Sequence, residues 1–264
     1  MSGFASAAIA CQALVQRDVR AVLRSRSQLY SSLLMPLGLL AILGAGVSDG
    51  LDPAAVRDGD YASFLVPGII VMAALFSSTF SSASFYYDRD WGVLKVLFAS
   101  PHSPRVILFG KSLAGMLIGS LQALAVLLVA ALVPAIDLDW QYGVVPGALL
   151  AAATILLLAV FLNGFAQVVA SRIRTMQGFH LVMNLVLFPL LFFSGAFFPL
   201  DELPVWLKVL AVVDPLSYAV DALRAAIYLD GSGYFGLALD FAVLATLGPA
   251  LFAWGVRRQP QLDW

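Results

Sequence analysis

Six long stretches of this sequence contain almost no charge, and they constrain its fold more than any other feature. No Asp, Glu, Lys or Arg lies between residues 26 and 49, 60 and 88, 111 and 137, 139 and 172, or 174 and 201, and only Asp240 interrupts residues 231–256. A helix needs about 20 apolar residues to cross a bilayer. The sequence therefore predicts an all-α membrane protein with six transmembrane helices. A soluble enzyme, a nucleic-acid-binding protein and a β-barrel are excluded.

Composition agrees with a single membrane domain. Of 264 residues, 61% are hydrophobic and 12% are charged, about half the charged share of an average soluble domain. We expect one domain over residues 1–264, with an interfacial helix in 1–27, spans in 28–256 and a cytoplasmic tail at 257–264. The six spans are expected at Gln28–Val47, Phe64–Tyr86, Val106–Val133, Val145–Ala170, Phe179–Phe198 and Gly236–Val256.

The distribution of basic residues predicts the orientation. If the N-terminus is cytoplasmic, all Lys and Arg residues except Arg57, Lys208 and Arg224 fall on the cytoplasmic side, as the positive-inside rule requires. Both termini are then cytoplasmic. Within Ala5–Arg26, polar residues recur every four positions up to Arg24, which indicates an amphipathic helix in the membrane interface. A simple anchor without a partner is the alternative reading of this helix.

Two connecting segments have unusual patterns. The loop Tyr87–Arg105 is expected to begin with a short helix that ends at Pro101. Segment Leu200–Asp230 is too charged to cross the membrane, yet it holds two short apolar pieces, Leu203–Val213 and Leu216–Tyr228. Each is too short to span the hydrocarbon. We expect two external half-helices here, between the fifth and sixth spans.

The sequence shows no motif with which this chain could power transport by itself. Gly110-Lys111-Ser112 resembles the end of a phosphate-binding loop, but the required earlier glycine is replaced by Arg105. Lys111 is instead expected to snorkel at the end of the third span. The sequence shows no catalytic cluster, no metal-spaced ligands and no mid-span carboxylate except Asp240, near the outer end of the last span. The chain is therefore predicted not to be an enzyme, and energy for uphill transport must come from another subunit.

Polar residues inside the spans have two readings. Amides and hydroxyls are costly in lipid unless they face protein or water, so they either bond neighbouring helices or line a substrate path. The candidates for a substrate path are Ser77, Ser81, Asn163, Gln167, Asn184 and Phe188. In the third span Gly115, Gly119 and Ala123 recur every fourth position, which favours close approach of another helix, from the same chain or from a second copy.

Three motifs carry a family resemblance that covers essentially the whole chain. Residues 88–101 read Asp-Arg-Asp-Trp-Gly-Val-Leu-Lys-Val-Leu-Phe-Ala-Ser-Pro, residues 193–200 read Phe-Ser-Gly-Ala-Phe-Phe-Pro-Leu, and residues 214–218 read Asp-Pro-Leu-Ser-Tyr, followed by Asp221 and Arg224. In this order they resemble the ABC-2 type exporter permeases, including the daunorubicin-resistance-like drug exporters.

The chain departs from that family pattern at three positions. Val93 stands where threonine is common, Lys95 where glutamate is common and Asp214 where asparagine is common. Lys95 reverses a charge in the loop that should meet the ATPase. Asp214 is expected to cap the half-helix that follows it.

The resemblance implies the transmembrane permease of an ATP-driven exporter in the bacterial inner membrane. Two copies of the chain would form a homodimer among membrane lipids and bind two cytoplasmic ATP-binding cassette subunits, which would hold ATP and Mg²⁺; this chain would bind no cofactor and no nucleic acid. The expected cargo is an amphipathic drug-like or lipid-like molecule, exported by alternating access.

We expect the helix Ala5–Arg26 and the loop Tyr87–Pro101 to form an ATPase-coupling surface, and the half-helices of Leu200–Asp230 to form an outer gate. The coupling residues are Arg17, Arg20, Arg24, Asp88, Arg89, Asp90, Gly92, Lys95, Ser100 and Pro101. The gate residues are Phe197, Phe198, Pro199, Asp214, Pro215, Tyr218, Asp221 and Arg224.

Other functions stay open at this point. Within the family, the alternative is a polysaccharide or lipid-linked glycan exporter. Outside it, the alternatives are a stand-alone channel or carrier, which would transport without an ATPase, and a membrane scaffold that transports nothing.

Overall fold

The computed structural model describes residues 2–48, 61–100, 102–134, 136, 138–228 and 233–258. Within these ranges every regular element is a helix. Pro101, the expected external loop Asp49–Asp60 and residues 259–264 lie outside the described residues. The elements are α1 (Ser2–Arg24), α2 (Arg26–Ser48), α3 (Tyr61–Asp90), α4 (Val93–Phe98), α5 (Pro104–Leu132), α6 (Val144–Ala170), α7 (Met176–Phe193), the 3₁₀ turn η2 (Leu200–Glu202), α8 (Val205–Val213), α9 (Pro215–Ile227) and α10 (Leu237–Arg258).

The predicted spans correspond to α2, α3, α5, α6, α7 and α10. Five of these helices are long and apolar enough to cross a bilayer, and α2 carries a shorter apolar stretch, Ser32–Gly44. The prediction for the fifth span is wrong at its end, because α7 stops at Phe193 rather than at Phe198. The next residues cannot continue the helix, since Gly195 takes a φ of 77°, the left-handed conformation that commonly terminates helices.

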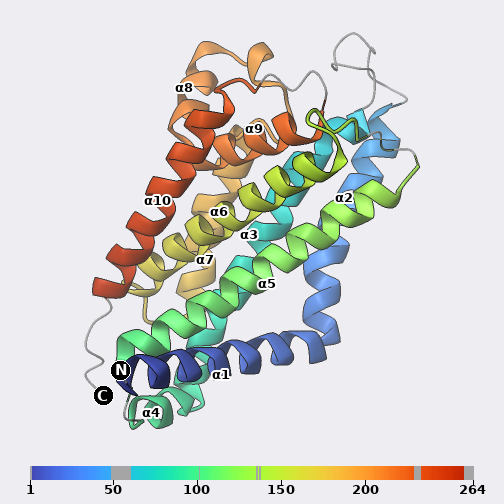
Figure 1. Ribbon diagram of the computed structural model, residues 1–264. Coiled ribbons are helices and arrows are strands. Elements are labelled where there is room, and N and C mark those ends of the chain that lie inside the picture. The colour runs from blue at the N-terminus through green and yellow to red at the C-terminus, as the bar shows by residue number, and fades with distance from the viewer. Residues whose placement is uncertain are drawn as a thin grey trace.

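Helix α3 lies at the centre of the bundle and contacts α2, α5, α6 and α7. Most of its side chains between Ser63 and Tyr86 are buried. Figure 1 shows α1 lying across the ends of the long helices, at the same end as α4, whereas α8 and α9 lie at the opposite end. The start of α1 and the end of α10 are at the same end of the bundle, as an even number of crossings requires.

The short helices α4, α8 and α9 are present where short helices were predicted, but they begin and end at somewhat different residues. Helices α8 and α9 are the two expected half-helices, separated at Asp214. The first connecting loop differs from the prediction, because α3 continues to Asp90 before a turn at Gly92 starts α4. Gly92 has a φ of 74°, so it provides the left-handed residue that the reversal between α3 and α4 needs.

Helices α6 and α10 are in close contact, and glycines permit the close approach. A methyl group on Gly164 would lie 2.8 Å from both the carbonyl oxygen of Gly248 and the backbone nitrogen of Phe252. Gly255 is similarly close to α6, with Gln167 Cβ at 2.8 Å from where its own methyl would stand. The two helices therefore touch backbone to backbone, as small residues allow in membranes.

We expect Gly164→Ala to lower stability in detergent by about 1–3 kcal/mol, because the backbones of α6 and α10 must move apart. The matched control is Gly38→Ala in α2, where a methyl group meets nothing within 4 Å. That change should be neutral or slightly stabilising, since alanine suits a helix interior better than glycine. Thermal unfolding of the two variants compares them directly, and equal melting temperatures would contradict the close-packing argument.

Candidate functional site: a buried ion cluster and an adjoining pocket

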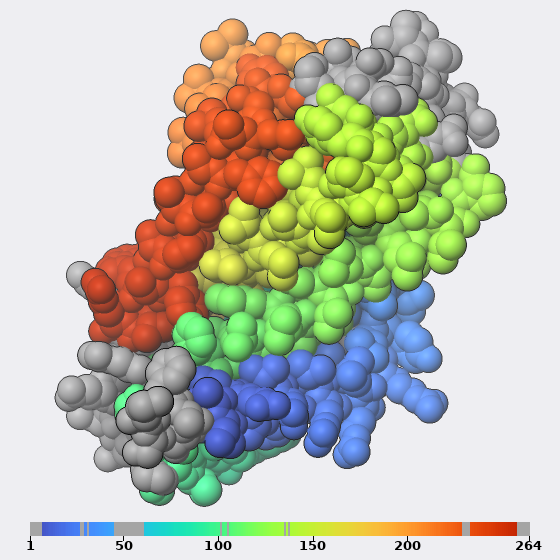
Figure 2. All heavy atoms as spheres, in the orientation of Figure 1, coloured from blue at the N-terminus to red at the C-terminus, as the bar shows by residue number. Residues whose placement is uncertain are grey.

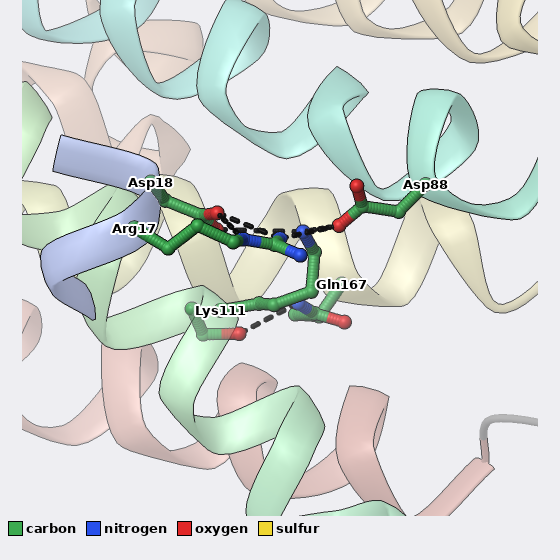
Figure 3. A network of polar contacts seen from close by, with 6 residues as sticks. Arg17, Asp18, Asp88, Lys111 and Gln167 are labelled. Atoms are coloured by element: carbon green, nitrogen blue, oxygen red, sulfur yellow. Dashed lines mark hydrogen bonds and ion pairs between the residues drawn. The ribbon is translucent and has the colours of Figure 1, made fainter. Parts of the chain in front are cut away.

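Four charged side chains from three helices meet at the α1–α4 end of the bundle (Figure 3). Arg17 of α1 contacts Asp88 of α3 at 2.6 Å and Asp18 at 2.7 Å. Lys111 of α5 pairs with Asp88 and lies 3.4 Å from Asp18. We call Arg17, Asp18, Asp88 and Lys111 the ion cluster. It links the helix that lies across the bundle to two of the spans.

The ion cluster is balanced in charge and largely buried. Two cations face two carboxylates, and only 4% of the Lys111 side chain is exposed. Burial alone would lower the pKa of Arg17, but the charges and hydrogen bonds of Asp18 and Asp88 outweigh it and raise this pKa. Arg17 and Lys111 each lie against both carboxylates, so the two positive and two negative side chains balance one another at this site.

The expectation that Lys111 snorkels toward water is wrong. A lysine at a helix end reaches outward when nothing opposes its charge, but here α1 covers it and supplies Asp18. The preceding residue makes this cover possible. A methyl group on Gly110 would lie 3.0 Å from Leu14 Cδ1 and 3.3 Å from Cys11 Cα, so α1 lies directly on α5 at this glycine.

A pocket of about 390 Å³ adjoins the ion cluster. Asp18 reaches its wall, which mixes hydroxyl groups with aromatic and aliphatic side chains. We call it the access pocket. Its other walls come from α3, α5 and α7, and the residues used below are Phe80, Ser81, Ser84, Tyr87 and His180. The pocket volume falls in the range of small-molecule sites, about 300–1,000 Å³.

The predicted substrate-path residues occupy three different environments. Asn163 is buried between helices and donates to the carbonyl oxygen of Ala159 at 2.9 Å and to Ser78 Oγ at 3.4 Å. Ser77 is also buried. Gln167 donates to Ser112 Oγ at 2.6 Å. These three side chains lie within the bundle, where they join or face neighbouring helices.

The remaining candidates lie on or near surfaces. Ser81 lines the access pocket. Asn184 is exposed on α7, and Phe188 packs edge-on against Phe76 with ring centroids 5.6 Å apart. The small residues of α5 face this chain's own helices, because Gly115 and Gly119 lie next to side chains of α3 and α6.

The predicted coupling residues divide between the ion cluster and the exposed end. Arg17 and Asp88 belong to the ion cluster. Arg20, Arg24 and Lys95 are exposed. Arg89 pairs with Asp90 at 3.0 Å, Ser100 Oγ donates to the carbonyl oxygen of Leu97, and Gly92 forms the α3–α4 turn.

The predicted gate residues hold α9 in place at the opposite end. Asp214 Oδ1 accepts the backbone N–H of Leu216 at 2.9 Å and so caps α9, as expected from its position. The other contacts are made by residues one turn apart along α9. Tyr218 donates to the carbonyl oxygen of Val212, Asp221 accepts the backbone N–H groups of Tyr234 and Phe235, and Arg224 donates to the carbonyl oxygen of Gly195.

The other gate residues surround the start of α9. Phe197 is buried and Phe198 is exposed. Pro199 precedes η2. Pro215 occupies the first turn of α9, where its missing N–H costs nothing.

The buried carboxyl of Asp214 predicts a pH dependence of stability. Burial raises its pKa from 3.8 to about 8, although hydrogen bonds from Leu216 and Ser217 act in the opposite direction. An acid whose pKa is higher in the folded state stabilises the fold fully below its unfolded pKa and loses this contribution as the pH rises through the folded value. We therefore expect the stability of the wild type to fall relative to Asp214→Asn between roughly pH 4 and pH 8.

Asparagine is the matched replacement because it still caps helices but does not titrate. Melting temperatures of both proteins across this pH range test the expectation. Parallel curves would show that Asp214 stays ionised in the folded protein.

Sequence comparisons place this architecture among known proteins. The family model of the ABC-2 type transporter matches residues 9–228, from α1 through α9. The chain belongs to the ABC-2 type transporter family. It is accordingly a multi-pass membrane protein of the transport permease class, and its ion cluster and access pocket are features of an ABC-2 permease.

Individual relatives are distant but cover most of the chain. A protein named transport permease ycf38 from Cyanophora paradoxa is 27% identical over 80% of this chain and 71% of its own length. The daunorubicin resistance ABC transporter permease protein DrrB1 of Streptomyces coeruleorubidus is 27% identical, over 86% of this chain and 77% of its own length. A protein named as multidrug ABC transporter permease YbhR from Escherichia coli K12 is 26% identical over 74% of this chain, which spans about half, 52%, of YbhR.

Sequence reasoning missed several residues of the site. Asp18, Lys111 and Ser112 carry its polar contacts, and Phe80, Ser84 and His180 line the access pocket. One signal was available, since Asp18 is the sole acidic residue of α1 and lies on a helix otherwise rich in arginine. An isolated opposite charge on such a helix indicates a specific partner.

Proposed function

We propose that this chain is the membrane permease of an ATP-driven exporter, working as a homodimer with two ATP-binding cassette subunits. The end with α1 and α4 faces the cytoplasm, as the basic residues predict. The cargo is an amphipathic drug-like or lipid-like molecule that enters the access pocket. The chain itself contributes the path and the coupling surface, while the partner hydrolyses ATP.

The observation that supports an ATPase partner is a pair of exposed apolar side chains, one on the α3–α4 turn and one on α4. Trp91 is 77% exposed and Val96 of α4 is 74% exposed. At the end that we assign to the cytoplasm, these two side chains offer an apolar surface to a cytoplasmic subunit. The ion cluster lies at the same end and joins α1, α3 and α5, so a push on this turn would move these three helices together.

The mixed walls of the access pocket support an amphipathic cargo. Phe80 and Tyr87 offer ring faces, Ser81 and Ser84 offer hydroxyl groups, and His180 adds a polar ring whose centroid lies 6.2 Å from that of Phe80. Sites of this composition bind molecules that carry an apolar body and a few polar groups.

Co-purification with the ATPase encoded beside the gene tests the proposal. The intact complex of the wild type should weigh as two permeases and two ATPases. Trp91→Ala should lose the ATPase, because the apolar contact is removed, whereas Trp206→Ala should keep it. Trp206 is a suitable control because it is also strongly exposed, at 63%, but belongs to α8 at the opposite end. A wild-type chain that retains no ATPase in several detergents would overturn the proposal in favour of a stand-alone carrier.

A further inference from the structure

A second, more apolar hollow lies beside α1, on a different side from the access pocket. It has a volume of about 710 Å³ and is bounded by α1, the first turns of α5 and the last turn of α10. We call it the α1 groove. Ala8, Cys11 and Val15 form one wall, Val106 and Phe109 the second, and Val256 the third. In Figure 2 the part of the molecule that contains α1 lies against α5 below the lower end of α10.

The groove is a consequence of how α1 crosses the bundle. At Gly110 the two helices touch, and the Cys11 thiol donates to the carbonyl oxygen of Val106 at 3.5 Å. On the other side of the groove, Phe109 of α5 packs edge-on against Phe252 of α10, with ring centroids 5.8 Å apart. A wedge is left between three helices, and its floor is aromatic and aliphatic.

The chemistry of the rim differs from that of the walls. Gln12 and Gln16 line the groove and are exposed, so their amides can reach the interface. Arg257 follows Val256 directly and is exposed at the end of α10. An apolar channel with amides on its rim, and with an exposed cation in the residue next to its α10 wall, is complementary to a molecule with an acyl chain and an anionic head. In a membrane protein, with α1 at the interface, phospholipid is the molecule of that kind that surrounds the chain.

We propose that the α1 groove binds one acyl chain of an anionic phospholipid from the adjacent leaflet, with the lipid phosphate beside Arg257. The site rests on the fold and on the interfacial position of α1, not on the ATPase or on the cargo. The bound lipid fills the wedge under α1 and thereby supports the helix that carries Arg17 and Asp18 of the ion cluster.

Native mass spectrometry of the purified full chain, titrated with palmitoyl-oleoyl-phosphatidylglycerol, tests this proposal. Ala8→Phe places a ring in the groove and should weaken lipid binding about tenfold or more. The matched control is Ala13→Phe, which adds the same ring at an exposed position of α1 that does not line the groove. Arg257→Gln should remove the preference for phosphatidylglycerol over phosphatidylcholine with the same acyl chains.

The cysteine provides a second readout that does not depend on mass. The sequence contains one cysteine, Cys11, and it lines the groove, so phosphatidylglycerol should slow its alkylation in the wild type and in Ala13→Phe. Two results would overturn the proposal. One is equal lipid retention by Ala8→Phe and Ala13→Phe, with both variants folded by circular dichroism. The other is lipid binding that occurs only after removal of residues 259–264, which would make the chain's own tail the occupant. Loss of the ATPase complex would leave both readouts unaffected and would count against the proposed function alone.

Discussion

Replacing Lys111 by methionine is expected to destabilise the protein by about 2–4 kcal/mol, because it removes the more buried of the two cations that face Asp18 and Asp88. In the variant Asp18 and Asp88 would face each other with Arg17 as the remaining partner. Their like charges repel more strongly at this largely buried site than they would in bulk water. Methionine preserves most of the side-chain volume of Lys111, so the loss of stability would reflect the missing charge rather than altered packing.

Two companion variants make the expectation specific. Lys111→Met combined with Asp88→Asn again balances one cation against one carboxylate, so the double variant should be more stable than Lys111→Met alone. Arg20→Met removes an exposed cation of α1 and should change stability by less than about 0.5 kcal/mol. Unfolding by sodium dodecyl sulfate, followed by circular dichroism, provides the free energies. A double variant less stable than the single one would show that the four charges do not act as one cluster.

The ion cluster also bears on how α1 works. Helix α1 is amphipathic, and a plain interfacial anchor would hold to the bundle through apolar contacts alone. Instead its carboxylate and guanidinium groups are fixed to α3 and α5 by ion pairs of defined geometry. The cost of removing the charges from water offsets much of the attraction within a buried ion pair, so such pairs add little net stability. We infer that they fix the register of α1 against the spans.

The positions of the transmembrane helices could be predicted from the sequence, because a bilayer restricts the composition of any segment that crosses it. A bilayer excludes unpaired charge over a fixed thickness, so the uncharged runs alone place α3, α5, α6 and α10 to within a few residues. Capping by Asp214 was equally local, since it depends on the two residues that follow. The end of α7 was missed because apolar residues continue past it, and the conformation of Gly195 stops the helix.

The ion cluster was not predictable from local pattern. Lys111 and Asp18 are 93 residues apart in sequence, and they meet because α1 folds back across α5 at Gly110. The access pocket was equally unpredictable from local pattern, because its walls come from four helices, α1, α3, α5 and α7. Contacts of this kind depend on how helices are placed around one another, which hydropathy and charge do not encode.

Filling the access pocket should strongly reduce transport while leaving the complex with the ATPase intact. Ser84 lines the pocket and is half-buried, so in Ser84→Phe the new ring would occupy space that the cargo needs. We expect efflux to fall about tenfold or more. Ser82→Phe is the matched control, because Ser82 has the same partial burial on the same helix but does not line the pocket.

Efflux of daunorubicin and other fluorescent amphipathic dyes from cells that express the permease and its ATPase measures the effect. Melting temperature and ATPase retention should be alike in Ser84→Phe and Ser82→Phe, so a selective loss of efflux would separate a cargo site from a structural one. A scaffold that transports nothing would show no wild-type efflux at all. Equal efflux in the two variants would show that the path does not run through the access pocket. The pair of serines therefore tests whether this pocket is part of the path.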